Sequence, residues 1–375
     1  MKKIAIEAQR IFRRDKHGMD FVILEVLREL TRLDDGNHYY VIVAPGEDVC
    51  LTASDNLTIV PLACPTYPLW EQMALPRIVR KLGADLLHCT SNTAPLSCPI
   101  PLMITLHDVI YLEPRTRRNP SLYQELGRHY RRWVVPRIIP RCQHIITVSH
   151  YEEAQICHTL PSVEGRISTV YNGYSQRFRQ LSAIDPTIIE RYLPQTDYLF
   201  LLGNTDPKKN SVGALKAYSL YLEASRVKRP LLIADLSEVH IDHILQQEGL
   251  QHIKSHLYYP GYIPHFHLPT LYNAAFAFLY PSLRESFGIP LLESMACGTP
   301  VVTSNTSAIP EIAGDEAILV DPTQPQAIAD VLLRLENDPA FYATQADYGP
   351  ARARHFSWAQ TAKAYSNLYN SITHA

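Results

Sequence analysis

Two glutamates lie on either side of an expected helix start in the segment 281–302, which reads PSLRESFGIPLLESMACGTPVV. Pro290 suits a first helical position, because it has no N–H to lose there and its φ is preset. We therefore predict a turn over 285–288 that contains Glu285, and a short helix with Glu293 one turn inside. The apolar runs AAFAFLYPS before the turn and PVVTS after the helix predict buried parallel strands.

Such a turn places the free N–H groups and the positive dipole end of a helix at the carboxyl end of a strand, where phosphates bind well. Two acids beside a phosphate site are compatible with it if they accept hydrogen bonds from hydroxyls. One would hold a sugar and the other the ribose of its nucleotide. A helix whose glutamates merely face water has the same spacing, so spacing alone leaves both interpretations open.

The stretch ESFGIPLLESMACGTPVV resembles the signature of glycosyltransferase family 4, whose members are retaining enzymes of the GT-B architecture. The resemblance implies that Glu285 grips the transferred sugar and that Glu293 grips the nucleotide ribose. It also implies that the turn and helix start face the donor phosphates, through Phe287, Gly288 and Ile289. The family's usual glycine is replaced by Ser286.

A second phosphate-binding turn is indicated at 203–210, where GNTDPKKN separates the expected strand YLFLLG from the helical segment SVGALKAYSLYLEA. Lysines at a strand-to-helix turn suit a phosphate, because they are compact charges beside helix N–H groups. By resemblance to the family, Lys209 matches its stricter lysine, and Lys208 stands where arginine is common. No two aspartates are separated by one residue, so the motif by which many sugar transferases hold Mg²⁺ is absent.

Three further positions are assigned by the resemblance. His107 ends the expected strand LMITLH, where a lone histidine is more often structural. The family implies that it positions the sugar and that its backbone carbonyl stabilises developing positive charge. Gly18, before the expected helix DFVILEVLREL that Asp20 could cap, matches a loop facing the donor phosphates and the acceptor, although the double glycine is missing. Ile263 ends a loop that would face the nucleotide base.

The length of 375 residues predicts two domains. Short β-branched runs alternate with amphipathic segments, which predicts βαβ units with parallel sheets. The family implies two Rossmann-like domains whose sheets face a central cleft. The expected boundaries are an acceptor-binding domain at 1–175, a linker at 176–196, a nucleotide-sugar domain at 197–352, and a helix at 353–375 that crosses back to the first domain.

The segment 113–141 is strongly basic and aromatic. It has Tyr123, Tyr130 and Trp133 and only the acids Glu113 and Glu125; its eight arginines are at 115, 117, 118, 128, 131, 132, 137 and 141. Such a surface can bind an anionic bilayer, a lipid-linked pyrophosphate or nucleic acid, or it can be a solvated helix face. We expect peripheral association with the inner membrane and no nucleic-acid partner.

The remaining composition favours a cytoplasmic enzyme without a metal or a separate cofactor. The charged residues Glu7 and Arg10 come too early for a signal peptide, and no run of eighteen apolar residues occurs. The seven cysteines are odd in number and scattered, which indicates reduced thiols. The histidines of HIDH at 240 and HFH at 265 lack a partner cluster, so a surface or core role is expected for them.

The resemblance to family 4 implies a retaining glycosyltransferase that transfers a hexose to a glycan or lipid-linked glycan in polysaccharide biosynthesis. Because the chain resembles mannosyltransferases of surface polysaccharide assembly, mannose from GDP-mannose is the first choice. UDP-hexoses stay open as donors. The alternatives are a nucleotide-sugar isomerase or epimerase on the same scaffold, a non-catalytic nucleotide-sugar-binding or membrane-binding protein, and a nucleic-acid-binding protein that uses the arginine-rich surface.

Overall fold

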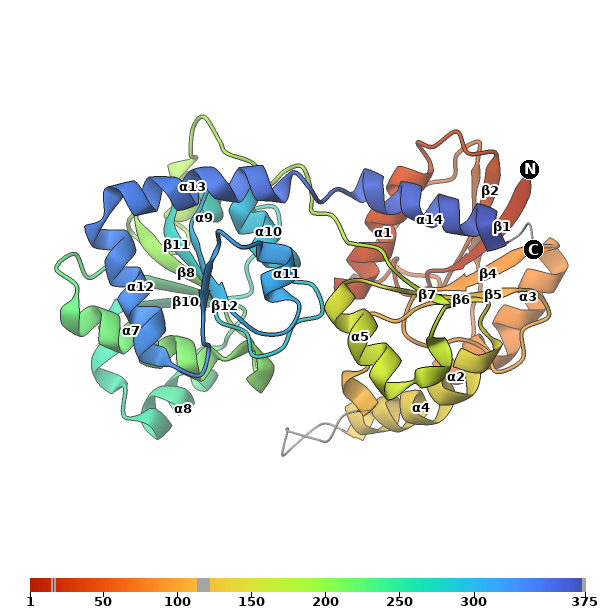
Figure 1. The fold of residues 1–375 in the computed structure, drawn as a ribbon, viewed down its shortest axis with the longest axis horizontal. Helices are drawn as coiled ribbons and strands as arrows, with labels where there is room; N and C mark the ends of the chain where they lie inside the picture. Colours follow the sequence, from red (N-terminus) through yellow and green to blue (C-terminus); the bar gives the residue numbers. More distant parts are fainter. Residues whose placement is uncertain (15, 17, 113–121, 373–375) are drawn as a thin grey trace. The chain divides into compact units, whose positions relative to one another are not determined.

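The computed structural model describes residues 1–14, 16, 18–112 and 122–372. The chain forms two compact units, which are described separately (Figure 1). Unit 1 comprises Met1–Gly173 and Ser357–Ala375, and unit 2 comprises Tyr174–Phe356. Among the described residues, no helix combines the length and apolar character needed to cross a bilayer.

Unit 1 is built on a seven-stranded sheet in the order β3-β2-β1-β4-β5-β6-β7. Every neighbouring pair is parallel, as the sequence predicts. The central strands β4 and β5 are buried along their whole length, which explains their continuous apolar runs. The strands are β1 (Lys2–Glu7), β2 (Asn37–Val43), β3 (Leu57–Pro61), β4 (Leu86–Cys89), β5 (Leu102–Thr105), β6 (His144–Thr147) and β7 (Ile167–Thr169).

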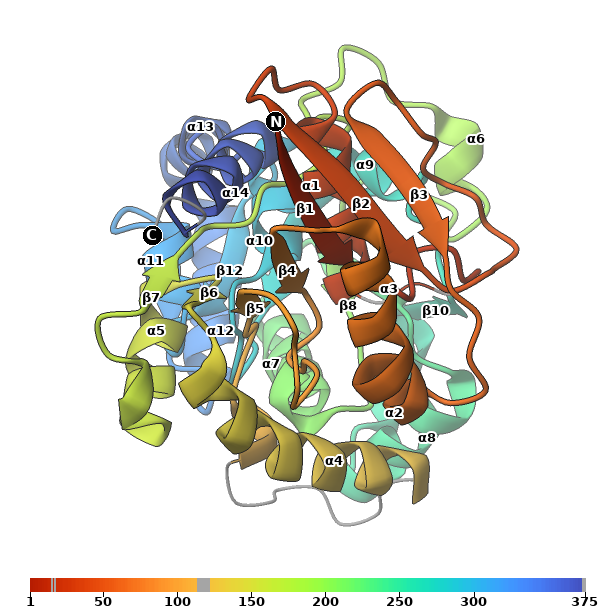
Figure 2. The same ribbon diagram turned by 90° about the vertical axis from the view of Figure 1, so that its right-hand side faces the viewer.

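The last helix of the chain belongs to unit 1, where it lies alongside α1 (Figure 2). Polar contacts fix it to the sheet and to the turn before β2. The Tyr369 hydroxyl lies 2.8 Å from Nδ1 of the buried His88 in β4, and the Ser366 hydroxyl donates to Asp35 at 2.5 Å. The helices of unit 1 are α1 (Gly18–Leu30), α2 (Tyr67–Leu69), η1 (Trp70–Ala74), α3 (Leu75–Leu82), η2 (Ile110–Leu112), α4 (Leu122–Ile138), η3 (Ile139–Arg141), α5 (His150–Thr159), η4 (Pro161–Val163) and α14 (Trp358–Ile372).

The expected cap of α1 is wrong. The helix begins at Gly18, so Asp20 lies in its first turn instead of preceding it. The Asp20 carboxylate is buried and pairs with two arginines of the preceding loop, Arg10 at 3.2 Å and Arg13 at 2.7 Å. An acid in the first turn is still favourable for the helix dipole.

Unit 2 has a six-stranded parallel sheet in the order β10-β9-β8-β11-β12-β13. The predicted apolar runs YLFLLG, AAFAFLYPS and PVVTS correspond to β8, β11 and β12. The edge strand β13 was not predicted, because its three residues are too short to show a pattern. The strands are β8 (Tyr198–Leu202), β9 (Leu231–Ala234), β10 (Leu257–Gly261), β11 (Ala275–Tyr280), β12 (Val301–Ser304) and β13 (Ile318–Val320).

Helices cover both faces of this sheet. Leu199 and Leu201 join an apolar core with α7, α8 and α12, whereas Phe200, on the other face, packs against Tyr272 of α9 with ring centroids 5.2 Å apart. The helices are α6 (Pro186–Ile189), η5 (Pro207–Lys209), α7 (Ser211–Ala224), α8 (Glu238–Glu248), η6 (Gln251–His256), α9 (Leu268–Ala274), α10 (Ile289–Ala296), α11 (Ile309–Ala313), α12 (Pro325–Asn337) and α13 (Pro339–Ala353).

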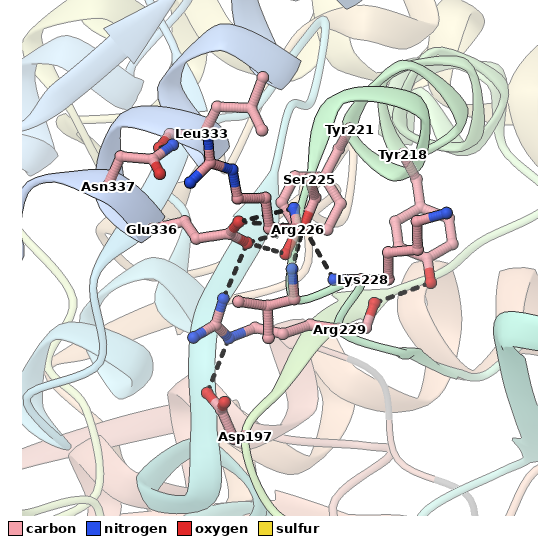
Figure 3. Close-up of polar contacts among 11 residues, drawn as sticks. Asp197, Tyr218, Tyr221, Ser225, Arg226, Lys228, Arg229, Leu333, Glu336 and Asn337 are labelled. Atoms are coloured by element: carbon pink, nitrogen blue, oxygen red, sulfur yellow. Dashed lines mark hydrogen bonds and ion pairs between the residues drawn. The ribbon is translucent and has the colours of Figure 1, made fainter.

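A polar cluster joins α7 and α12 (Figure 3). The Glu336 carboxylate of α12 accepts hydrogen bonds from the Tyr221 hydroxyl at 2.6 Å and the Ser225 hydroxyl at 2.8 Å. It also pairs with the Arg229 guanidinium at 2.9 Å, and Arg229 in turn contacts Asp197 at 2.8 Å. The cluster ties two helices to the residues that lead into β8 and β9.

The strand order reverses once in each sheet. In unit 1 the reversal lies between β1 and β4, and in unit 2 it lies between β8 and β11. Loops leaving adjacent strands at such a point turn to opposite faces and open a crevice at the carboxyl ends, which is where open α/β sheets bind ligands. The candidate site residues are therefore expected in the loops at the carboxyl ends of the strands, at and near these reversals.

Candidate active site

In unit 2, the loops that follow β8 and β11 are bonded to each other. Asn210 adopts a left-handed conformation with φ 57°, and its side-chain amide donates to the carbonyls of Pro281 at 3.0 Å and Pro322 at 2.7 Å. The Leu283 N–H donates to the Lys208 carbonyl at 2.7 Å. These hydrogen bonds hold the lysine-bearing turn against the glutamate-bearing turn at the reversal of the strand order.

Lys209 and Glu285 come together at this point. The Lys209 ammonium lies 2.6 Å from Oε1 of Glu285, and the glutamate side chain is only 11% exposed. The Glu285 N–H donates to the Ser307 hydroxyl at 3.0 Å, which fixes the backbone of the turn. Burial by itself would raise the pKa of Glu285, but the Lys209 charge offsets this effect and holds the pKa below its ordinary value. Glu285 is thus an ionised acceptor beside a cation.

The start of α10 has the backbone that the sequence predicts, with one difference. Gly288 is the N-cap residue with φ 102° and ψ 54°, and no side chain caps the first turn. Pro290 is the second helical residue and not the first, because the helix begins at Ile289. Phe287 is buried, with its ring 5.9 Å from that of Phe356. A glycine is required here because residues that carry a side chain rarely adopt this φ.

Glu293 lies one turn inside α10 and is buried. Its Oε1 lies 3.2 Å from Nε2 of His265, whose ring packs edge-on against Phe178 at 5.2 Å. Burial raises the pKa of Glu293, and the neighbouring His265 and Arg177 counteract part of that rise. From the sequence, only a surface or core role was expected for His265. No local signal reveals its contact, because the glutamate is 28 residues away.

The other predicted residues of unit 2 lie after the carboxyl ends of strands in the same sheet. Ile263 is buried and follows β10, where the Asp235 N–H donates to the Gly261 carbonyl at 2.8 Å. Lys208 has a partly exposed side chain whose ammonium is 3.9 Å from Asp206. The structure therefore joins Lys209 directly to Glu285, whereas Lys208 has a different acidic neighbour.

In unit 1, His107 follows β5 and is buried. Its N–H donates to the Asn92 amide oxygen at 2.6 Å, and its Nε2 lies 3.0 Å from the Thr90 carbonyl. A carbonyl can only accept, so Nε2 carries the proton. Burial lowers the pKa of His107, which favours the neutral ring. These contacts fix the ring at the carboxyl ends of β4 and β5.

Gly18 is exposed at the start of α1, and a Cβ atom there would meet nothing within 4 Å. Nothing in the described part of unit 1 therefore requires a glycine at this position, and its role stays a prediction. Of the basic segment 113–141, residues 113–121 lie outside the described residues. The rest forms α4 and η3.

Within the described parts of the chain, no three histidine, cysteine, aspartate or glutamate side chains gather into a group that could hold a metal ion. All seven cysteines are free thiols. At the reversal point of unit 2, the structure brings together the Lys209 ammonium, the Glu285 carboxylate and the start of α10. Such a set can bind an anion and accept hydrogen bonds from hydroxyls.

Two α/β units with parallel sheets are the GT-B architecture, and comparison with solved structures bears this out. Sucrose-phosphate synthase from Thermosynechococcus elongatus superposes with a TM-score of 0.75 over 99% of both chains, at 20% identity. The predicted fold class is confirmed.

The family follows from the sequence comparisons. Residues 17–176 match the model described as Glycosyltransferase Family 4, and residues 190–352 match the model described as Glycosyl transferases group 1. The chain belongs to glycosyltransferase family 4.

Two curated relatives are similar to this chain. O-antigen chain mannosyltransferase B of Escherichia coli is 33% identical over 230 residues, which are 60% of each chain. O-antigen chain mannosyltransferase RfbU of Salmonella typhimurium is 24% identical over 308 residues, which are 80% of this chain and 78% of that protein. The chain thus spans less than two thirds of the length of the first of these relatives.

Proposed function

We propose that this protein is a retaining glycosyltransferase that transfers a hexose from a nucleotide-sugar donor to a glycan or lipid-linked glycan in polysaccharide biosynthesis. The observation that carries the proposal is the contact of Lys209 with Glu285 where the strand order of unit 2 reverses. Membership of family 4 and the O-antigen mannosyltransferases among the relatives support the reaction class and favour mannose as the sugar.

The chemistry expected of these residues is mainly electrostatic. As the bond from the sugar's first carbon to the phosphate oxygen lengthens, negative charge grows on the phosphate and positive charge on the ring. Lys209, Lys208 and the start of α10 stabilise the phosphate, and a preorganised group of this kind contributes about 3 to 4 kcal/mol. Lys209 can turn from Glu285 to the diphosphate, which frees the carboxylate for the sugar hydroxyls.

The ribose and the ring are assigned to two other residues. Glu293 accepts hydrogen bonds from the ribose hydroxyls, and its contact with His265 keeps the carboxylate oriented. His107 contributes its backbone carbonyl, a fixed dipole, to the positive charge that develops on the sugar ring. Its neutral ring, held by Thr90, adds no opposing charge.

Retention of configuration follows from attack on the face that the phosphate leaves. The acceptor oxygen forms a bond to the sugar's first carbon while the bond from that carbon to the phosphate oxygen breaks. The proton of the acceptor hydroxyl moves to the departing phosphate. No carboxylate nucleophile takes part in this scheme, and Glu285 acts as an acceptor of hydrogen bonds from the sugar hydroxyls.

The test combines binding with turnover. Calorimetric titration of the protein with UDP and GDP identifies the nucleotide base of the donor. Transfer from the matching hexose donor is then measured for the wild type and for Glu285→Gln. We expect this variant to lose transfer and to keep nucleoside diphosphate binding. The control is Glu248→Gln, which removes a carboxylate paired with Lys216 at the far end of α8. Full transfer by Glu285→Gln would refute the role of Glu285.

The anomeric proton signal of the product separates retention from inversion. Formation of a new sugar nucleotide from the donor without an acceptor would instead favour the isomerase alternative. If neither UDP nor GDP binds, the proposed function is wrong as a whole.

A membrane-borne acceptor is supported by the exposed face of α4. Trp133 is 50% exposed and Leu126 is 62% exposed, and the Arg137 guanidinium stacks 5.0 Å from the Trp133 ring. An aromatic, arginine-rich helix face suits the interface of an anionic bilayer. We expect the protein to sediment with anionic vesicles and not with neutral ones, and Trp133→Gln to weaken this binding. Val239→Gln, at an exposed site of unit 2, is the control.

A further inference from the structure

The loop after β12 forms one side of the turn that carries Glu285. Strand β12 pairs in parallel with β11, so the loops that leave the two strands run next to each other. The Glu285 N–H donates to the Ser307 hydroxyl at 3.0 Å, and the Ala308 N–H donates to the Glu285 carbonyl at 3.3 Å. Two consecutive residues of this loop therefore hold both polar groups of the Glu285 backbone.

The loop is anchored at both of its ends. At its start, the Asn305 N–H donates to the Val320 carbonyl of β13 at 2.9 Å. At its end the loop continues into α11, where the Glu311 carbonyl accepts from the Arg352 guanidinium of α13 at 2.6 Å. A loop that is anchored in this way can hold the Ser307 hydroxyl at a fixed position.

Ser307 adopts a backbone conformation that serine rarely takes. Its φ is 56°, in the left-handed region. A Cβ atom comes too close to the following carbonyl oxygen in this region, and glycine avoids that cost. Residues held in such conformations are concentrated at functional sites. A glycine would relieve the strain at this position, but it would leave the Glu285 N–H without the hydroxyl that accepts its hydrogen bond.

The backbone of Glu285 is held from two sides, and the two sides differ in kind. On the side of β8, the Leu283 N–H donates to the Lys208 carbonyl at 2.7 Å, and the Lys209 ammonium pairs with the Glu285 carboxylate at 2.6 Å. The lysine contact is lost when Lys209 turns to a diphosphate. The Ser307 contact is made to the backbone and can persist. A misplacement of about 1 Å can lower a rate about a hundredfold.

We propose that Ser307 is a positioning residue for Glu285. Its hydroxyl holds the Glu285 backbone after Lys209 has turned to the donor phosphates, and so keeps the carboxylate in line with the sugar hydroxyls. This assignment rests on the proposed glycosyltransferase function. Ser307 acts through Glu285 and does not itself touch the substrate. It therefore affects the binding and transfer of the sugar, and not the binding of the nucleoside diphosphate.

Two substitutions that have in common the loss of the hydroxyl test the proposal. Ser307→Gly also relieves the left-handed strain, whereas Ser307→Ala keeps it, so the glycine variant should unfold at the same or a higher temperature. Both variants should nevertheless transfer the hexose about tenfold to a hundredfold more slowly than the wild type. The matched control is Lys228→Gly, which relieves the same kind of strain at φ 55° in the exposed turn between α7 and β9. It should transfer at the wild-type rate.

Calorimetric binding separates a positioning role from a general structural one. The wild type should bind the nucleotide hexose more tightly than the nucleoside diphosphate, and the ratio of the two affinities measures the contacts of the sugar. This ratio should fall in Ser307→Gly and in Glu285→Gln, while Ser307→Gly binds the nucleoside diphosphate as tightly as the wild type. The two substitutions together should lower the ratio no further than Glu285→Gln alone, because Ser307 acts through that carboxylate.

Three results would overturn the proposal: wild-type transfer by both Ser307 variants, equal losses of affinity for the nucleotide hexose and the nucleoside diphosphate in Ser307→Gly, or a further fall of the affinity ratio in the doubly substituted protein. If the nucleoside diphosphate binds and Glu285→Gln loses transfer while the Ser307 variants keep it, only the role of Ser307 fails. If neither UDP nor GDP binds to the wild type, the proposed function fails.

Discussion

Removal of the Glu336 carboxylate should destabilise unit 2 through one identifiable mechanism. The Glu336 side chain is 4% exposed and the Arg229 side chain 11%, so this is a buried ion pair. Breaking such a pair by removing one partner costs about 3 to 5 kcal/mol. Arg229 keeps its contact with Asp197 in the variant, so its charge is not orphaned. We therefore expect about 3 kcal/mol for Glu336→Ala, at the lower end of that range.

Two further variants separate the effect of the Glu336 charge from that of its shape and burial. Glu336→Gln keeps an oxygen that can accept from the Tyr221 hydroxyl, so the loss should be about 1 to 2 kcal/mol. Glu248→Gln removes a carboxylate of similar geometry, 2.7 Å from Lys216, in a pair whose side chains are 42% and 31% exposed. An exposed pair contributes about 0 to 1 kcal/mol, so this control should stay close to the wild type.

The pH dependence gives an independent check. Burial alone would raise the pKa of Glu336, but the hydroxyls of Tyr221 and Ser225 and the Arg229 charge more than offset it, and the pKa lies below its ordinary value of 4.5. Because the folded pKa is depressed, the stabilisation is present above the unfolded pKa and is lost as the pH falls through the folded one. The difference between wild type and Glu336→Gln should shrink below about pH 4.5.

The assay is unfolding in urea, monitored by the hydrogen exchange of peptides from α7 and α12. This readout reports on unit 2 alone and does not assume that both units unfold together. The expected order of stability loss at pH 7 is Glu336→Ala, then Glu336→Gln, then Glu248→Gln. Equal losses in Glu336→Ala and Glu248→Gln would show that the buried cluster adds nothing beyond an exposed pair, and the reasoning would be refuted.

Two other predictions concern the site. Gly288→Ala places a Cβ atom at a residue with φ 102°, 3.0 Å from Ile309, so we expect the free energy of unfolding to fall by about 1 to 3 kcal/mol in thermal unfolding. The control Gly18→Ala, at an open position, should change the stability little. Equal effects of the two variants would contradict the backbone argument. His265→Ala should raise the pKa of Glu293 further, because the histidine opposes the effect of burial. As the pH is lowered, nucleoside diphosphate binding should therefore be lost at a higher pH in His265→Ala than in the wild type. In Glu293→Gln, binding should not show this loss at low pH.

Strand positions could be predicted from the sequence because buried parallel strands are continuous apolar runs, as in β4, β5 and β8. The strand β13 could not, since Ile318–Val320 is too short to carry a period. Asp20 was expected as a cap because acids favour that position, but its pairing with Arg10 and Arg13 is a tertiary contact. Local propensity cannot report such contacts.

For the candidate site, the individual residues could be predicted from the sequence, as the strands could. A signature segment supplied Glu285, Gly288 and Glu293, and a strand-to-helix turn supplied Lys209. Their mutual arrangement was not predictable, because Lys209 and Glu285 are 76 residues apart and meet only through the order of strands in the sheet. The contacts of His265 with Glu293 and of Ser307 with Glu285 depend in the same way on packing between distant segments.

The direct pairing of Lys209 with Glu285 has a consequence for the proposed reaction. A carboxylate whose pKa is held below its ordinary value stays ionised at neutral pH, so Glu285 can accept hydrogen bonds and cannot donate a proton. This paired state of Glu285 fits a residue that grips hydroxyls. When a diphosphate draws Lys209 away, the carboxylate loses its cation while buried, and the sugar hydroxyls must replace it. Donor phosphate and donor sugar should therefore bind unit 2 cooperatively, and a nucleoside diphosphate without the sugar should bind Glu285→Gln at least as tightly as the wild type.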